Sequence, residues 1–251
     1  MKLDIVGAAY EHQSQDVNFQ QCVNMYVASA GPEGRGRAAL VPTPGLTLVK
    51  DLGDDPVRGV LTFGDYTYVV SGDTVYQLTV NNVTKQVTNT TNIGTIGTTT
   101  GTVYLAANPR QVRIVDGSAS GYIWTQATTT FSTISDGDFN GGKQVVFLDG
   151  YFVYFAADTG QIYTSALNNG LAWDALDVGT AESGPDNIMG LSSSKGELWV
   201  FGAATTEIWY DAANASGIPL SPRVGLEIQI GCQASDSITR VDDFIIWLDD
   251  R

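Results

Sequence analysis

The chain has 251 residues, of which 43% are hydrophobic, 10% aromatic and 16% charged, so it holds enough apolar material for a sizeable core and is not globally disordered. Its 27 Asp and Glu residues outnumber 13 Lys and Arg residues, which gives a formal net charge of -14. Because an acidic surface repels phosphate, this charge argues against a dedicated DNA-reading or membrane-surface role.

Residues 1–36 are predicted to form an N-terminal arm with little core of its own. The opening stretch has no apolar core of signal-peptide length, and no stretch of the chain approaches the roughly 18 apolar residues that span a bilayer. We therefore expect synthesis in the cytoplasm, unless an export signal has been removed. The one histidine, His12, lies in this polar arm, so catalytic or metal sites built on histidine are not predicted.

A series of β-hairpins is predicted beyond residue 57. Each begins with a strand rich in aromatic and β-branched residues; in the first four, a small turn and a second strand with an aromatic residue follow. The hairpins lie at 65–78, 110–124, 150–165, 196–210 and 242–251. Their leading strands end at Val70, Val115, Phe155, Phe201 and Leu248. A spacing of about 40 to 50 residues between strand-rich repeats is typical of a β-propeller with one four-stranded blade per repeat.

Two further strands complete each predicted blade. An apolar strand precedes each hairpin, at 59–63, 102–106, 144–148, 187–191 and 237–241. A more polar strand follows the first four, at 85–90, 131–134, 175–178 and 224–230, as suits a solvent-facing outer edge. The predicted blades are 57–92, 99–136, 142–182, 185–231 and an unfinished 233–251.

The sequence therefore predicts an all-β fold: a β-propeller domain over 37–251, incomplete at about four and a half blades. A propeller closes its ring by packing its last blade on its first, typically with about 4 to 8 blades. Because residue 251 falls at a hairpin turn, we expect the chain to be the N-terminal part of a longer protein. Residues 37–49 are interpreted as a spare strand for the closing blade.

Several segments together resemble a known family. They are QQCVNMYV at 20–27, AALVPTPGL at 38–46, and the longer stretches at 134–154, 173–191 and 197–211. In order and spacing they resemble the packaged-DNA stabilisation proteins of short-tailed bacteriophages. Residues 211–222 depart from the family's usual connection. The motif positions that we interpret as structural are Cys22, Asn24, Pro42, Pro44, Gly45, Asp149, Gly150 and Trp209.

The resemblance implies a β-propeller that serves as a structural virion protein, without enzymatic activity or cofactor. Members of the family form the hub or nozzle of the tail, at the head–tail connection below the portal, usually as a six-fold ring. The implied partners are the portal or adaptor, the distal tail proteins and further copies of the chain. DNA would pass through the ring without specific binding, and the implied location is the virion tail, after synthesis in the host cytoplasm.

The sharpest local motif is DGDFNG at 136–141. Asp136, Asp138 and Asn140 match the first ligand positions of a calcium loop, but Phe147 stands where a bidentate Glu is expected. Clusters of Asp, Asn and Gly are also ordinary turn chemistry. We therefore predict a structural turn here and no metal site, with a calcium-binding turn as the less favoured alternative.

Other candidate motifs also favour structural interpretations. Residues 168–173 partly match the Asp-box turn of sialidase-type propellers, which is itself a structural turn. Three of the five tryptophans, Trp199, Trp209 and Trp247, are predicted to be core residues. Trp124 and Trp173 are left open between core positions and sugar-binding platforms, so a carbohydrate-binding or glycoside-hydrolase propeller is the alternative function.

The chain has two cysteines, Cys22 and Cys232, far apart in the sequence. A secreted disulfide scaffold of this length would contain more. Two buried free thiols are expected, and a single bridge between them stays open.

Overall fold

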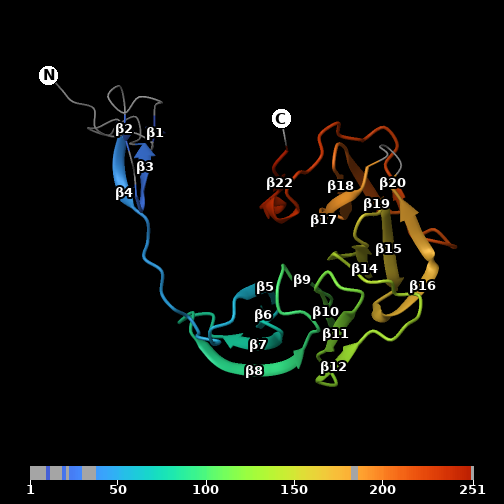
Figure 1. Cartoon of the computed structure of the whole chain (residues 1–251), viewed down its shortest axis with the longest axis horizontal. Helices are drawn as coiled ribbons and strands as arrows, with labels where there is room; N and C mark the ends of the chain where they lie inside the picture. Colours follow the sequence, from blue (N-terminus) through green and yellow to red (C-terminus); the bar gives the residue numbers. More distant parts are fainter. Residues whose placement is uncertain (1–9, 12–18, 21–22, 30–37, 182–185, 250–251) are drawn as a thin grey trace. The chain divides into compact units, whose positions relative to one another are not determined.

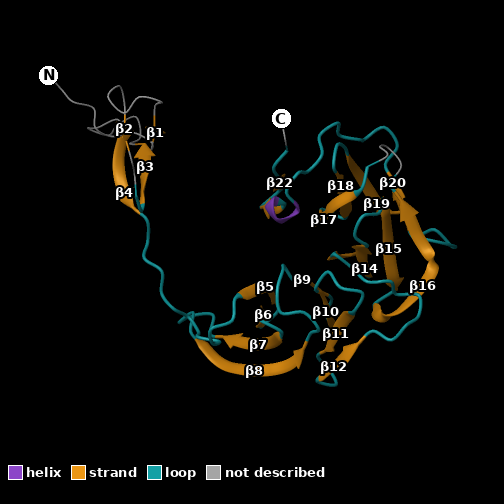
Figure 2. Ribbon diagram, in the orientation of Figure 1, coloured by secondary structure: helices purple, strands orange, loops and turns teal. Residues whose placement is uncertain are grey.

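The computed structural model describes residues 10–11, 19–20, 23–29, 38–181 and 186–249, which fall into two compact units, Met1–Val49 and Lys50–Arg251. In these ranges the regular structure is β-strand, apart from one turn of 3-10 helix at Ser235–Ser237 (Figure 2). The same ranges contain no helix that is long and apolar enough to cross a membrane.

The first unit consists of short antiparallel pairs. Strand β1 (Tyr10–Glu11) pairs with β2 (Phe19–Gln20), and β3 (Met25–Ser29) pairs with β4 (Ala38–Pro42).

The segment that was interpreted as a spare strand, residues 37–49, contains β4 of this hairpin. Residues 38–42 are not spare: they form β4 and complete the hairpin with β3, so the first unit ends at Val49. This segment pairs with the strand that directly precedes it in the sequence, and closing so short a loop costs little entropy.

The second unit contains four four-stranded antiparallel sheets, each a meander of strands consecutive in sequence, and a two-stranded fifth sheet. The strands are β5 (Val57–Phe63), β6 (Tyr66–Ser71), β7 (Thr74–Val80) and β8 (Val87–Thr95) in the first sheet; β9 (Tyr104–Ala107), β10 (Gln111–Val115), β11 (Gly121–Thr125) and β12 (Thr130–Thr133) in the second; β13 (Gln144–Leu148), β14 (Tyr151–Phe155), β15 (Gln161–Ala166) and β16 (Asn169–Thr180) in the third; β17 (Ile188–Ser194), β18 (Glu197–Gly202), β19 (Thr206–Asp211) and β20 (Leu220–Pro222) in the fourth; and β21 (Thr239–Val241) and β22 (Phe244–Ile246) in the fifth.

The sheets of the second unit are arranged as propeller blades. The first strand of each sheet contacts the first strand of the next: β5 contacts β9, β9 contacts β13, β13 contacts β17, and β17 contacts β21. In Figure 1, β5, β9 and β17 lie on the inner side of the curve that the sheets follow, and β8, β12 and β16 on its outer side. This arrangement confirms the predicted fold class.

The outer strand of the fourth blade is not where the sequence analysis placed it. It was expected at 224–230, but β20 occupies Leu220–Pro222, and the later segment makes only an isolated bridge between Thr206 and Ile228. Leu220 is buried in the core whereas Val224 is 98% exposed, so the earlier segment offers the better apolar contact. One further rung follows β20, where the N–H of Arg223 donates to the carbonyl of Ile208 at 2.7 Å.

The hydrophobic core lies between adjacent blades. One cluster joins the first and second blades, a second joins the second and third, and a third joins the third and fourth. The repeat positions Val70, Val115 and Phe155 are each at most 1% exposed and lie in these three clusters. Phe201, 0% exposed, packs instead against Trp199 and Trp247. The fifth position, Leu248, is 62% exposed and lies beyond β22, which ends at Ile246, so the prediction that the strand ends at Leu248 is wrong.

Glycine permits close approach of the blades at two equivalent positions. Gly59 in β5 and Gly190 in β17 each follow a register irregularity and pair with Val70 and Phe201, respectively. A Cβ at Gly59 would lie 2.3 Å from the carbonyl oxygen of Val103, in the segment entering the second blade. Only a residue without a side chain fits there.

Buried polar side chains also tie each blade to the next. Arg58 in β5 donates from Nε to the carbonyl of Gly101 at 2.7 Å and from Nη1 to that of Thr98 at 2.6 Å, holding the connection to the second blade. Gln144 in β13 donates to the carbonyl of Leu191 at 3.0 Å and accepts from its N–H at 2.8 Å. These contacts satisfy backbone groups that β-ladders leave unpaired.

Replacing Gly59 with Ala should destabilise the protein by about 1–3 kcal/mol, because the new methyl group meets backbone that has no room to rotate away. Chemical denaturation of the purified protein measures the change. The matched control is Gly137→Ala, where no atom lies within 4 Å of the added Cβ, and its effect should stay within about 0.5 kcal/mol. Equal stabilities for the two variants would contradict the close approach of the blades.

Candidate functional site

In the turn at 136–141, the carboxylate of Asp136 accepts hydrogen bonds from the backbone of the fold. Asp136 accepts hydrogen bonds from the backbone N–H of Trp173 at 3.0 Å and of Asp138 at 3.1 Å, and these two bonds, in that order, lower the pKa of its carboxyl group. Asn140 accepts from the hydroxyl of Tyr154 at 2.7 Å. The hydrogen bonds explain Asp136 and Asn140 as turn residues that anchor the third blade.

Beneath this turn lies a buried cation, which the sequence analysis did not anticipate. Arg113 in β10 is 0% exposed, and its three side-chain nitrogens have no hydrogen-bond partner among the described residues. The guanidinium carbon lies 4.5 Å from the ring centre of Phe139 and 5.3 Å from that of Trp173. Burial lowers the pKa of Arg113 to about 9, and the faces of Phe139 and Trp173 lie within cation–π distance of its guanidinium group.

The burial of the tryptophans differs in part from the prediction. Trp209 is buried as expected, whereas Trp199 and Trp247 are only half-buried and pack edge to face, with ring centres 6.4 Å apart. Trp124 and Trp173, which were left open, are both buried in the core. Neither of these two therefore offers a free ring face as a sugar-binding platform.

Four of the motif positions named from the family resemblance lie near the hairpin of the first unit. Asn24 has a left-handed backbone, with φ of 55°, and its carbonyl accepts from the N–H of Thr43 at 2.9 Å. Pro42 is the last residue of β4, and Pro44 and Gly45 follow in exposed chain. These positions shape the end of the hairpin.

The other motif positions belong mostly to the blades. Asp149 and Gly150 form the two-residue turn between β13 and β14, and both have positive φ, 45° and 100°, as a tight hairpin turn requires. Trp209 donates from Nε1 to Oε2 of Glu207 at 2.7 Å in the core. Cys22 lies outside the described residues.

The remaining sequence candidates give no chemical site in the described part of the chain. Cys232 is a buried free thiol that donates to the carbonyl of Ala234 at 3.2 Å, and His12 lies outside the described residues. No three of the described His, Cys, Asp and Glu side chains are grouped so as to hold a metal ion.

Non-neighbouring blades are joined near the inner strands. Asp236, in the 3-10 helix that precedes the fifth blade, accepts hydrogen bonds from the hydroxyls of Thr102, at 3.1 Å, and Tyr104 of the second blade. Burial and then the Asp236 carboxylate raise the pKa of Tyr104 above its ordinary range. No local sequence pattern could predict this contact, because it joins residues more than a hundred positions apart.

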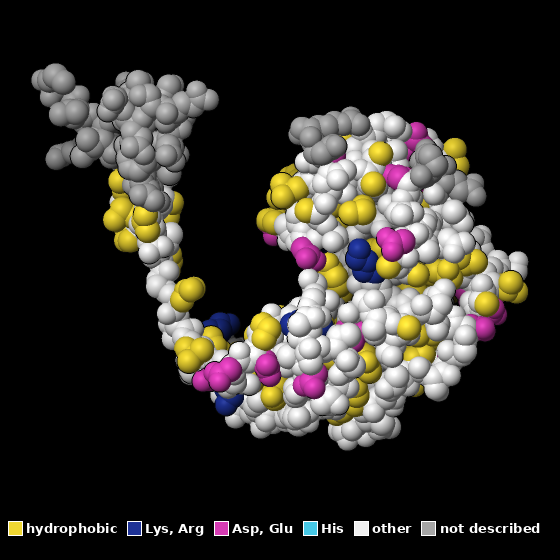
Figure 3. Space-filling model, viewed as in Figure 1, with side chains coloured by type: hydrophobic (Ala, Val, Ile, Leu, Met, Phe, Trp, Pro, Cys, Tyr) yellow, Lys and Arg dark blue, Asp and Glu magenta, His cyan; other side chains and the backbone are white. Residues whose placement is uncertain are grey.

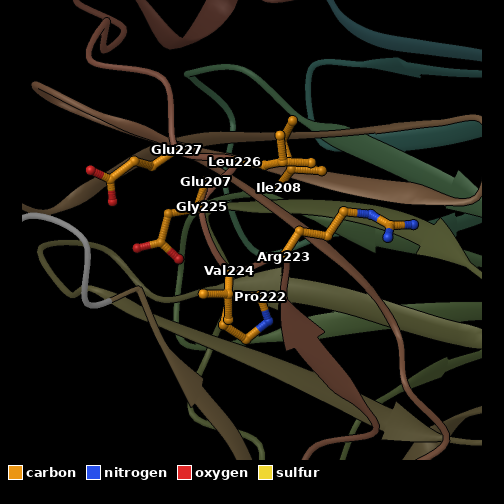
Figure 4. Close-up of a pocket in the computed structure, with 8 residues that line it drawn as sticks. All are labelled: Glu207, Ile208, Pro222, Arg223, Val224, Gly225, Leu226 and Glu227. Carbon is orange, nitrogen blue, oxygen red and sulfur yellow. The ribbon is translucent and has the colours of Figure 1, made fainter.

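One hollow, of about 220 Å3, lies beside β19 and β20 (Figure 4). In Figure 4 Arg223 extends away from Glu207 and Glu227. Arg223 pairs instead with Glu197, at 2.6 Å, and lies over the ring of Tyr210. The charged groups therefore do not converge as an acid–base pair would.

A larger and more polar hollow, of about 450 Å3, lies between the third blade and the 212–219 loop of the fourth. Asp174, Asp177 and Tyr151 line it. Burial, and then the charge of Asp174, raise the pKa of Asp177. The sequence signals for this hollow were the pair of aspartates in WDALDVG and the loop at 211–222 that departs from the family's usual connection.

Meandering four-stranded sheets with their cores between them define a β-propeller protein. A family model described as "Bacteriophage P22 Gp10, beta-propeller" matches residues 1–251, and the chain belongs to this family. It is therefore a phage structural protein, a component of the virion. A search of curated proteins found no match.

Solved structures with a similar fold include PorZ, a surface component of the type-IX secretion system of Porphyromonas gingivalis, at 15% identity and a TM-score of 0.47, covering 78% of this chain and 23% of that one. Kluyvelomyces marxianus Hsv2 matches at 12% identity and a TM-score of 0.45, covering 75% and 60%. The computationally designed Ika8 protein matches at 16% identity and a TM-score of 0.49, covering 87% and 65%. The chain spans less than two thirds of the length of each.

Replacement by Met should change the stability of the protein in opposite directions at the two buried arginines, Arg113 and Arg58. Arg113→Met removes an unpaired buried charge and should stabilise the protein by about 1–4 kcal/mol. Arg58→Met, the matched control, removes hydrogen bonds to backbone carbonyls and should cost about 3 kcal/mol or more. Thermal unfolding at neutral pH measures both; a loss of stability in Arg113→Met equal to that of Arg58→Met would refute the difference.

The ionisation of Tyr154 should lower stability as the pH rises above 10, opposite in sign to Arg113, whose lowered pKa favours the folded state in the same range. Burial raises the pKa of Tyr154 above its ordinary value of 10.0, so the unfolded chain ionises this phenol first and is favoured as the pH passes through that range. Thermal unfolding across alkaline pH measures the slope. Tyr154→Phe should lower stability at neutral pH, through loss of the bond to Asn140, but make the alkaline fall shallower. An unchanged slope would contradict this assignment.

Proposed function

We propose that this protein is a tail hub or nozzle subunit that closes the DNA exit channel below the portal and stabilises packaged DNA. The observation that carries the proposal is the family match over the whole of residues 1–251. The function is structural rather than enzymatic, and its place is the tail at the head–tail connection, after synthesis in the host cytoplasm.

The charge of the chain supports a channel through which DNA slides. With a net charge of -14, the protein repels phosphate groups and gives them no lasting contact. The face of the second unit in view in Figure 3 carries scattered acidic side chains and fewer basic ones. DNA would therefore pass through a ring of such subunits without specific binding.

The first unit supports assembly with neighbours. Tyr26 in the β3–β4 hairpin is 52% exposed, and Met25 and Val27, on the opposite face, are exposed as well. A two-stranded hairpin is marginally stable by itself in water, and apolar side chains on both faces favour contact with another surface. We propose that further copies of the chain, in a six-fold ring, and the portal or adaptor and distal tail proteins provide these surfaces.

The full-length protein, produced together with the portal and adaptor proteins, should form a ring of six copies on that complex, as native mass spectrometry would measure. Tyr26→Ser should weaken the assembly because it removes an exposed apolar contact. Val83→Ser is the matched control, since Val83 is exposed in the loop between β7 and β8 of the second unit. A protein that stays monomeric with these partners and is missing from purified virions would overturn the proposal.

A further inference from the structure

A hollow of about 200 Å3 lies between the first two blades. Its walls come from the turn between β5 and β6, the turn between β9 and β10, and the chain just after β11. Ligand pockets for drug-sized molecules typically measure about 300–1,000 Å3. This hollow is therefore sized for a single ring or side chain.

Aromatic rings form one wall of the hollow. Phe63 is 37% exposed, Tyr66 is half-buried and Tyr68 is buried. The rings of Tyr66 and Tyr68 are tilted by 52°, with centres 6.4 Å apart. The hydroxyl of Tyr66 makes no hydrogen bond to any residue that the structure describes. Partly open aromatic faces beside a polar group suit a ligand with both apolar C–H and hydroxyl surface.

A side-chain amide in the hollow is held in one orientation by the core. The Oε1 atom of Gln126 accepts hydrogen bonds from Tyr68 at 3.1 Å, Gln77 at 2.7 Å and Trp124 at 3.0 Å. Three donors on the oxygen direct the amide nitrogen away from them. Within the described residues this nitrogen has no partner, so it is a fixed donor for a ligand.

A second amide nitrogen is left unpaired at the same place. Oδ1 of Asn108 accepts from the backbone N–H groups of Arg110 at 2.8 Å and Gln111 at 2.7 Å. Its Nδ2 is buried and has no hydrogen-bond partner among the described residues. Unsatisfied buried donors are rare in native proteins and call for an explanation, such as a bound molecule.

The charged groups of the hollow are balanced and unpaired. Asp65 and Arg110 both line it, and neither forms an ion pair or a side-chain hydrogen bond with another described residue. Together with the amides they offer both donors and acceptors. Neutral hydroxyl groups, which donate and accept at once, match such a set better than a single charge does. The net charge of -14 also disfavours an anionic ligand.

We infer that this hollow binds one residue of a neutral sugar, with the ring against Tyr66 and hydroxyl groups on Gln126 and the neighbouring charged side chains. The site is independent of the tail-hub role. It also differs from the Trp124 and Trp173 platforms considered from sequence, since both of those rings are buried.

The test is titration of the full-length protein with free neutral monosaccharides, one at a time: glucose, galactose, mannose, rhamnose and N-acetylglucosamine. Saturation-transfer NMR detects binding, and at least one sugar should bind with a dissociation constant on the order of 1 mM. Gln126→Glu keeps the oxygen that accepts from Tyr68, Gln77 and Trp124 but removes the donor, and should weaken binding about tenfold without unfolding the blade. Tyr66→Ala should abolish binding.

The matched control is Tyr151→Ala. Tyr151 begins β14 as Tyr66 begins β6, but it lies in the third blade, and its replacement should leave sugar binding unchanged. Three results would each overturn the inference. In the first, none of the sugars shows binding even at concentrations well above about 1 mM. In the second, glucuronate binds while the neutral sugars do not, and in the third, binding persists in both Tyr66→Ala and Gln126→Glu.

Discussion

The structure of the second unit depends on burial of side chains between one blade and the next. A single four-stranded sheet has no layer beneath it, so Val70, Val115 and Phe155 leave water only when the adjacent sheet is in place. Each such side chain contributes about 1.5–3 kcal/mol when fully buried. Stability in this protein is therefore a property of neighbouring pairs of blades, as in other proteins built from stacked repeats.

Close packing and polar contacts cooperate at the same interfaces. Gly59 lets the innermost strand of the first blade approach backbone of the next, and Gly190 leaves room for the side chain of Ile238. Arg58 and Gln144 then reach backbone groups that sheet hydrogen bonds leave free. Apolar burial alone would allow blades to slide against each other, because it has no direction. Hydrogen bonds to particular carbonyls fix one register, and they work here because the surrounding residues exclude water.

The sequence predicted the blade positions that a local periodic pattern marks, and it missed contacts between residues far apart in the chain. Val70 and Phe201 were found because apolar and aromatic residues recur at blade spacing. Arg113 was missed because an arginine in an alternating strand normally faces water; its flanking Val and Ile residues in QVRIV were the available signal. The outer strand at Leu220–Pro222 was missed since three residues with a proline carry little pattern. The sugar-sized hollow depends on Gln126 meeting Tyr68 from another blade, a contact that periodicity does not encode.

The hydrogen bonds that Asp236 accepts from Thr102 and Tyr104 connect the segment before the fifth sheet directly to the second blade. A pull on the fifth sheet does not have to travel through the fourth and third blades in turn, because part of the load passes straight to the second. The segment that carries Asp236 is also fastened to the fourth blade, where Cys232 donates its N–H to Gly202 at 2.9 Å. Tension on one end of the unit is thus shared among three blades at once.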